Sequence, residues 1–143
     1  MGFGNPYGDL YNQDILLHWA QEMVKREIQI ISLADTVGIA TPEQVSTAVT
    51  SVISAYPDIT IGVHLHSSPV NWKAKAEAAL TAGCRRFDGA LKGIGGCPMA
   101  QDSLVGNMNS EWMIPYFEEK RLLTGIDKNA LLKSMVIADQ LFR

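Results

Sequence analysis

Residues 28–66 read IQIISLADTVGIATPEQVSTAVTSVISAYPDITIGVHLH, and this stretch decides the fold. Its beginning is rich in apolar, β-branched residues, which predicts a strand over residues 27–33 and a turn at residues 35–38. The nearly unbroken apolarity of this strand is typical of a parallel strand that is covered on both faces. We therefore expect other elements to pack against both sides of the sheet.

A helix follows over residues 41–55. Thr41 is placed to be its N-cap, Pro42 occupies the first helical position, and Gln44 completes a capping box. The helix has an apolar stripe made of Val45, Ala48, Val49 and Val52. A second strand is predicted over residues 59–66, so the stretch forms a strand–helix–strand unit.

The same unit repeats further along the chain. A helix is predicted over residues 71–82, ended by Gly83, and a third strand over residues 84–90. Further amphipathic helices are expected over residues 12–24, from Asn109 with Pro115 inside, and from Asp127. The last of these has an apolar stripe that is predicted to face inward, made of Leu131, Leu132, Met135, Ala138 and Leu141.

Alternating strands and helices of this length indicate an α/β fold with a parallel sheet, either doubly wound or closed into a barrel. A typical (β/α)8 barrel needs ~250 residues, so the 143 residues of this chain fit about half of one. We expect residues 1–143 to form one partial TIM-barrel domain without the N-terminal strands, too small to be the whole catalyst.

The composition narrows the classes of function. A net charge of −3 and a pI near 5.5 give no electrostatic reason to expect nucleic acid or an anionic membrane as a partner. The two cysteines are too few for a disulfide framework, and the N-terminus has no export-signal pattern. With no apolar run that approaches ~20 residues, a cytoplasmic location is expected.

His64 and His66 are the sharpest candidates for chemistry. Side chains two apart on a strand point the same way, and active sites of parallel barrels lie at the carboxyl ends of the strands. Imidazole is a common ligand of divalent metals, so the pair is a candidate metal site. The alternative is two histidines that serve only the core or the surface.

Other candidates lie beyond the strands. Cys97 follows a glycine-rich loop and could be a reactive thiol, although free cysteines usually act as small apolar residues. Asp35 and Asn107 each lie near the end of a strand–helix unit and could reach the barrel mouth. Both residue types are also common in turns.

Four motifs together resemble the 3-hydroxy-3-methylglutaryl-CoA lyase family. They are SLADTVG at residues 32–38, VHLH at 63–66, GIGGCPMA at 93–100 and Gly106-Asn107, supported by GNPY at 4–7. Their order and spacing match over nearly the whole chain. The Gly-Gly-Cys-Pro loop is the most specific of them.

The resemblance implies a (β/α)8 barrel that cleaves 3-hydroxy-3-methylglutaryl-CoA to acetyl-CoA and acetoacetate in leucine degradation. It implies a divalent cation, Mg²⁺ or Mn²⁺ with Zn²⁺ as a third candidate, bound by His64, His66 and Asn107. It also implies that Cys97 is the catalytic cysteine and that Asp35 is the acidic residue of the active site. Whether Asp35 or His64 takes the hydroxyl proton is left open, as is the role of Cys97 as acid, base or both.

The chain departs from the family in two ways. Nothing in it matches the first-strand Arg-Asp pair, which supplies a catalytic cation and a metal ligand, or a second acidic residue of the early strands. Ser67-Ser68 also stands where these lyases have Asp-Thr, which puts the support of the histidine ligands in question.

Two other interpretations remain open. Acyl-CoA synthases of the isopropylmalate synthase type share the barrel and the His-x-His pair but lack the Gly-Gly-Cys-Pro loop. A non-catalytic half barrel could instead bury its open edges by self-association or against a separate N-terminal half. Either a homo-oligomer or such a partner is expected, with an acyl-CoA as the small-molecule ligand.

Overall fold

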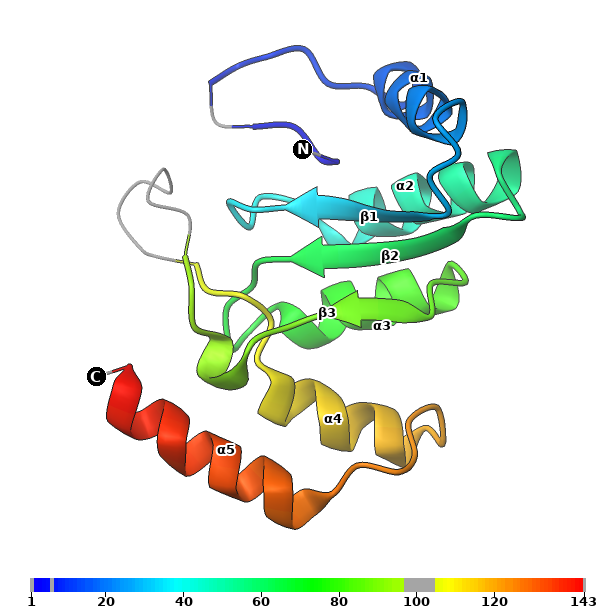
Figure 1. Ribbon diagram of the computed structural model, residues 1–143. Helices are drawn as coiled ribbons and strands as arrows, with labels where there is room; N and C mark the ends of the chain where they lie inside the picture. Colours follow the sequence, from blue (N-terminus) through cyan, green and yellow to red (C-terminus); the bar gives the residue numbers. More distant parts are fainter. Residues whose placement is uncertain (1, 6, 97–104, 143) are drawn as a thin grey trace.

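The computed structural model describes residues 2–5, 7–96 and 105–142. Helices alternate with strands along most of this part of the chain (Figure 1). In order, the elements are α1 (Gln13–Val24), β1 (Ile30–Asp35), α2 (Pro42–Ala55), β2 (Thr60–Leu65), α3 (Trp72–Thr81), β3 (Arg86–Asp88), the 3₁₀ turn η1 (Leu91–Gly93), α4 (Ser110–Glu119) and α5 (Lys128–Leu141).

The three strands form one parallel sheet in the order β1-β2-β3. Residue 34 pairs with His64 and Asp35 pairs with Leu65, while His64 also pairs with Asp88 on the other side. Figure 1 shows α2 and α3 together behind the sheet, with α1 beside β1 and α4 beside β3. This is the arrangement of successive strand–helix units in a (β/α)8 barrel, as the sequence predicted.

The core lies between the sheet and the α2–α3 layer. Alternate residues of β1 and β2 point into it, because side chains of a strand alternate between the two faces. Its largest contributors from these elements are Ile31, Leu33, Val45, Val49, Val52, Ile61, Val63 and Leu65. The predicted stripe of α2 is fully buried, and the capping box at Thr41 and Gln44 is present.

The opposite face of the sheet differs from the sequence-based expectation of cover on both sides. It carries Ser32, His64, Arg86 and Asp88, none of which is buried, and Ile30 is 54% exposed. In a barrel this is the inward face, on which polar residues are placed for function rather than for the packing of helices. The prediction of two covered faces was therefore wrong for the described part of the chain.

The ends of the strands also shift. The first strand begins at Ile30 rather than Glu27, because residues 25–27 form a turn in which Glu27 has a φ of 60°. The third strand is limited to Arg86–Asp88 instead of residues 84–90. Helix α3 ends where expected, at a Gly83 with a φ of 102°, a value that favours glycine.

The last helix corrects a second prediction. Of the expected inward stripe of α5 only Ala138 is buried, and Leu132 and Leu141 are 58% and 70% exposed. Helix α5 lies at the margin of the molecule and contacts η1 rather than the sheet (Figure 1). Amphipathic periodicity shows that a helix has an apolar face, but not that the described residues cover it.

Candidate metal centre at the carboxyl ends of the strands

His64 and His66 lie at the carboxyl end of β2. Their ring centroids are 5.5 Å apart, so the two imidazoles are close enough to approach a common ion. The His64 side chain is 35% exposed on the open face of the sheet, whereas His66 is 5% exposed just beyond the strand. The structure thus brings together the pair that the period-two spacing predicted.

Hydrogen bonds hold His66 in one orientation. Its Nδ1 lies 2.8 Å from the Val105 carbonyl oxygen, and because a carbonyl only accepts, Nδ1 must carry the proton. The neutral ring then has its lone pair on Nε2. This is the usual way in which a metal-binding imidazole is oriented by its second nitrogen.

Asn107 reaches the same place from a distant part of the sequence. It forms a β-bridge with His66, and the Ser67 amide donates to the Gly106 carbonyl at 2.9 Å. The Asn107 side chain donates from Nδ2 to the carbonyl of Ile94 at 2.7 Å and of Gly95 at 3.2 Å. These bonds use the amide as a donor, so Oδ1 is left as the atom that can bind a cation.

The glycine-rich loop has a steric reason in this arrangement. Gly95 has a φ of 94°, and a Cβ there would lie 2.8 Å from Asn107 Nδ2. A Cβ on Gly106 would lie 2.5 Å from the Gly93 carbonyl oxygen. The glycines therefore allow the two loop segments to pack closely enough to position the Asn107 amide.

Asp35 occupies a different position from the histidines. Its carboxylate is buried and accepts the amides of Ile39 at 3.0 Å and Ala40 at 2.9 Å. It also forms a 3.0 Å ion pair with Lys75, whose side chain is 1% exposed. Because Asp35 pairs in register with Leu65, its side chain points toward the helices and away from the face of His64.

Two residues near the candidate site were not found from the sequence. Asp88 Oδ2 lies 3.9 Å from His64 Nδ1, and Asp88 is held by Ser32 and Arg86 on the open face. The period-two pattern of the third strand was a usable signal, because it places Arg86 and Asp88 on one face. Lys75 carried no such signal, since a lysine within an amphipathic helix is normally solvated.

The donors fit a divalent cation in part. Two imidazole nitrogens and one amide oxygen form a mixed set of the kind that binds Mn²⁺ or Zn²⁺, while Mg²⁺ prefers more oxygen ligands. Within residues 2–5, 7–96 and 105–142, no group of three or more His, Cys, Asp or Glu residues could hold a metal by itself. Cys97, the predicted catalytic cysteine, lies outside the described residues.

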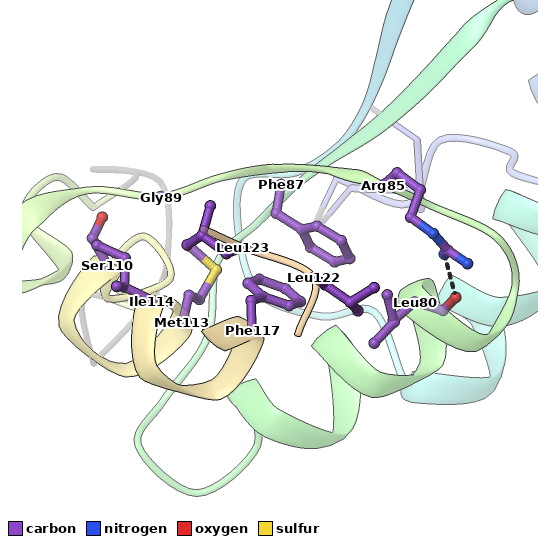
Figure 2. Close-up of a pocket in the computed structure, with 10 residues that line it drawn as sticks. All are labelled: Leu80, Arg85, Phe87, Gly89, Ser110, Met113, Ile114, Phe117, Leu122 and Leu123. Carbon is purple, nitrogen blue, oxygen red and sulfur yellow. Dashed lines mark hydrogen bonds between the residues drawn. The ribbon is translucent and has the colours of Figure 1, made fainter. Parts of the chain in front are cut away.

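The hollows of the structure separate the candidate site from the apolar layer. A hollow of about 370 Å³ beside the site is lined by Ser67, Lys92, Asn107, Asn109 and Trp112, among others. A second, of about 410 Å³, lies between β3 and α4 and is mostly apolar (Figure 2). Its Arg85 guanidinium donates to the Leu80 carbonyl at 2.9 Å, so this cation is already engaged.

The parallel strand–helix units, with candidate ligands at the strand ends, define this chain as part of a (β/α)8-barrel enzyme fold. A family model described as HMGL-like matches residues 3–136. The chain therefore belongs to the HMGL-like family of lyases, as the sequence motifs predicted.

The relatives agree with this assignment. An (R)-citramalyl-CoA lyase of Chloroflexus aurantiacus is 38% identical over 130 residues, covering 91% of this chain and 41% of that protein. A solved HMG-CoA lyase from Bacillus subtilis superposes with a TM-score of 0.86 at 29% identity, covering 97% of this chain and 47% of that one. A solved HMG-CoA lyase from Acinetobacter baumannii, in complex with coenzyme A and 3-methylmalate, gives 0.78 at 34% identity, covering 92% and 43%.

The chain spans less than half the length of the curated relatives that it matches most closely in the comparisons above, 41% and 44% for two of them. The helices of the described ranges include none that is long and apolar enough to cross a bilayer. The predictions of a cytoplasmic location and of one partial domain over residues 1–143 stay predictions.

Proposed function

We propose that this chain supplies the metal-binding part of a carbon–carbon lyase that cleaves 3-hydroxy-3-methylglutaryl-CoA to acetyl-CoA and acetoacetate. The observation that carries the proposal is the convergence of His64, His66 and Asn107 at the strand ends. His66 Nδ1 and Asn107 Nδ2 are used in internal hydrogen bonds, which leaves Nε2 and Oδ1 for a ligand.

His64, His66 and Asn107 would hold the cation, for which we propose Mg²⁺ or Mn²⁺, with Zn²⁺ as the third ion to test. When bound, such a cation supplies Lewis acidity to the oxygens of the substrate. The chain itself contributes the orientation of the ligands. That orientation comes from the Val105 carbonyl at His66 and from the packing of the glycine loop at Asn107.

The cleavage requires two proton transfers. A base removes the proton of the tertiary hydroxyl, the bond between C2 and C3 breaks, and its electron pair forms the enolate of acetyl-CoA while C3 becomes a ketone. We propose that His64 is the base, because it is the partly exposed imidazole and Asp88 lies near its Nδ1. Cys97 would then protonate the enolate carbon.

Asp35 has a different part in this proposal. Both of its oxygens accept hydrogen bonds within the protein, and its side chain faces the helices. We therefore assign it to the support of the loop at residues 36–40 rather than to proton transfer. This leaves His64 as the only one of the two proposed bases on the open face of the sheet.

The remaining catalytic groups lie outside these 143 residues. The Arg-Asp pair that the family resemblance implies has no counterpart in the sequence. We propose that these groups come from a segment that completes the barrel, on the same polypeptide or on a partner, with an acyl-CoA bound between the two parts. The open edges and the polar open face of the sheet support such an association.

A second substrate is favoured by one observation. The (R)-citramalyl-CoA lyase relative is 38% identical to this chain, more than the 30% of the Bacillus subtilis hydroxymethylglutaryl-CoA lyase. In a citramalyl thioester the carboxylate is attached directly to the carbinol carbon, so the same bond cleavage releases pyruvate instead of acetoacetate. The catalytic steps are unchanged, and only the group that binds the carboxylate differs.

The test uses the purified chain with Mn²⁺ and each thioester in turn. Acetyl-CoA, acetoacetate and pyruvate are measured separately, and Mn²⁺ binding is measured by electron paramagnetic resonance. Turnover of either thioester, or Mn²⁺ binding that is lost in His66→Ala and Asn107→Ala, supports the metal-centred proposal. Neither turnover nor Mn²⁺ binding by the folded chain would overturn it.

A further inference from the structure

Lys75 is a buried cation on α3 that the proposed chemistry does not use. Its side chain is 1% exposed, and it is the largest of the fully buried side chains in the described part. Its ammonium donates at 3.0 Å to Asp35 Oδ2, to the Gly38 carbonyl and to the His66 carbonyl. All three ammonium protons therefore have an acceptor.

These three acceptors belong to parts of the chain that form the mouth of the sheet. Asp35 ends β1, Gly38 lies in the loop after it, and His66 follows β2. Lys75 thus joins the ends of two neighbouring strands and the loop between β1 and α2. The loop is fixed a second time by the Asp35 carboxylate, which accepts the amides of Ile39 and Ala40.

His66 is held at three separate atoms as a result. Its amide donates to the Asp35 carbonyl at 2.9 Å, its carbonyl accepts from Lys75, and its ring Nδ1 donates to Val105. The residue that follows gives no comparable support. The Ser67 hydroxyl is buried without a hydrogen-bond partner among the described residues.

We propose that Lys75 is the positioning residue of His66, and that it supplies the support that the Asp-Thr pair after the histidines would otherwise provide. Lys75 acts on the backbone: it fixes the His66 carbonyl, and through it the direction in which the imidazole leaves the chain. The role of His66 as a metal ligand rests on the function proposed above. The positioning itself does not.

The closing experiment measures the His66 ring directly. Long-range proton–nitrogen NMR of the full chain, at a pH where the imidazole is neutral, distinguishes the Nδ1–H from the Nε2–H tautomer. Wild type is expected to show the Nδ1–H form at His66. In Lys75→Met and Lys75→Gln the ring is expected to shift to a mixture of tautomers, and Mn²⁺ affinity is expected to fall about 10- to 100-fold.

Val49→Ala is the matched control. Val49 is fully buried on α2, so the substitution opens a cavity in the same core without touching His66. It is expected to lower the melting temperature and to leave the His66 tautomer unchanged. Folded Lys75 variants with an unaltered His66 ring would overturn the proposal, even if the chain bound no metal at all.

Amide exchange in wild type covers the case in which both Lys75 variants fail to fold. The amides of His66, Ile39 and Ala40 are expected to exchange as slowly as that of Val63 in the middle of β2. Fast exchange at these three amides beside a protected Val63 would show that the network does not hold the mouth, and would also overturn the proposal.

Discussion

Asp35 and His64 end neighbouring parallel strands but face opposite sides of the sheet. The register pairs Asp35 with Leu65, and His64 with residue 34, so the two side chains have opposite directions. Asp35 is 1% exposed and bound to Lys75, while the His64 side chain is 35% exposed. Two residues that the sequence placed in one active site thus have separable physical roles.

Substitution should separate those roles. Asp35→Asn leaves the Lys75 ammonium buried without a counter-charge, which is expected to lower the free energy of unfolding by about 3–5 kcal/mol. His64→Ala, on the open face, is expected to change it by less than about 1 kcal/mol but to remove metal binding. Urea unfolding of both variants checks this, and similar losses of stability in the two would contradict it.

Asp88 is expected to tune His64. Asp88→Asn removes the carboxylate charge 3.9 Å from the imidazole Nδ1, and we expect Mn²⁺ affinity to fall roughly 10-fold. Asp58→Asn is the matched control, because Asp58 is exposed just before β2, at the opposite end of that strand from the histidines. Equal Mn²⁺ affinities of the two variants would exclude a role of Asp88 in the metal centre.

Cys84 is expected to be unreactive in the native protein. It is fully buried, its Sγ donates to the Arg86 carbonyl at 3.1 Å, and burial raises the pKa of its thiol, so the reactive thiolate is scarce at neutral pH. In Cys97→Ala, iodoacetamide should therefore label Cys84 only after urea is added. Peptide mass spectrometry measures this, and rapid labelling of native Cys97→Ala would be inconsistent with the described burial.

The capping box of α2 provides a local test of the fold. Thr41 Oγ1 accepts the Gln44 amide at 3.2 Å, and the Gln44 side chain accepts the Thr41 amide at 2.9 Å. Thr41→Ala is expected to cost about 1 kcal/mol of unfolding free energy. Thr50→Ala, at an exposed site inside the same helix, should be neutral or slightly stabilising, and a loss equal to that of Thr41→Ala would argue against the cap.

The local features were predictable from the sequence because they depend on neighbours in the chain. Helix α2 begins at Pro42 and ends at Ala55 as expected, since its cap and its apolar stripe lie within one short stretch. The shared direction of His64 and His66 follows from the pleat. The family motifs added the (β/α)8 barrel, which the comparisons confirm.

The support of the site was not predictable in this way. Lys75 and Asp35 are 40 residues apart, and His66 meets Val105 across 39 residues. A lysine in a helix and a serine pair after the histidines carry no local sign of these contacts. The exposed stripe of α5 has a similar origin, because periodicity does not specify what covers an apolar face.

The sequence by itself determined which elements form, their order, and which residues share a face, because propensity, capping and the period of the pleat act over a few residues. Only the tertiary structure decided that Asp35 turns away from His64, that Lys75 ties both strand ends, and that Asn107 reaches His66. Those relationships depend on the register of parallel strands and on how a helix packs across them. No short stretch of sequence encodes either of these.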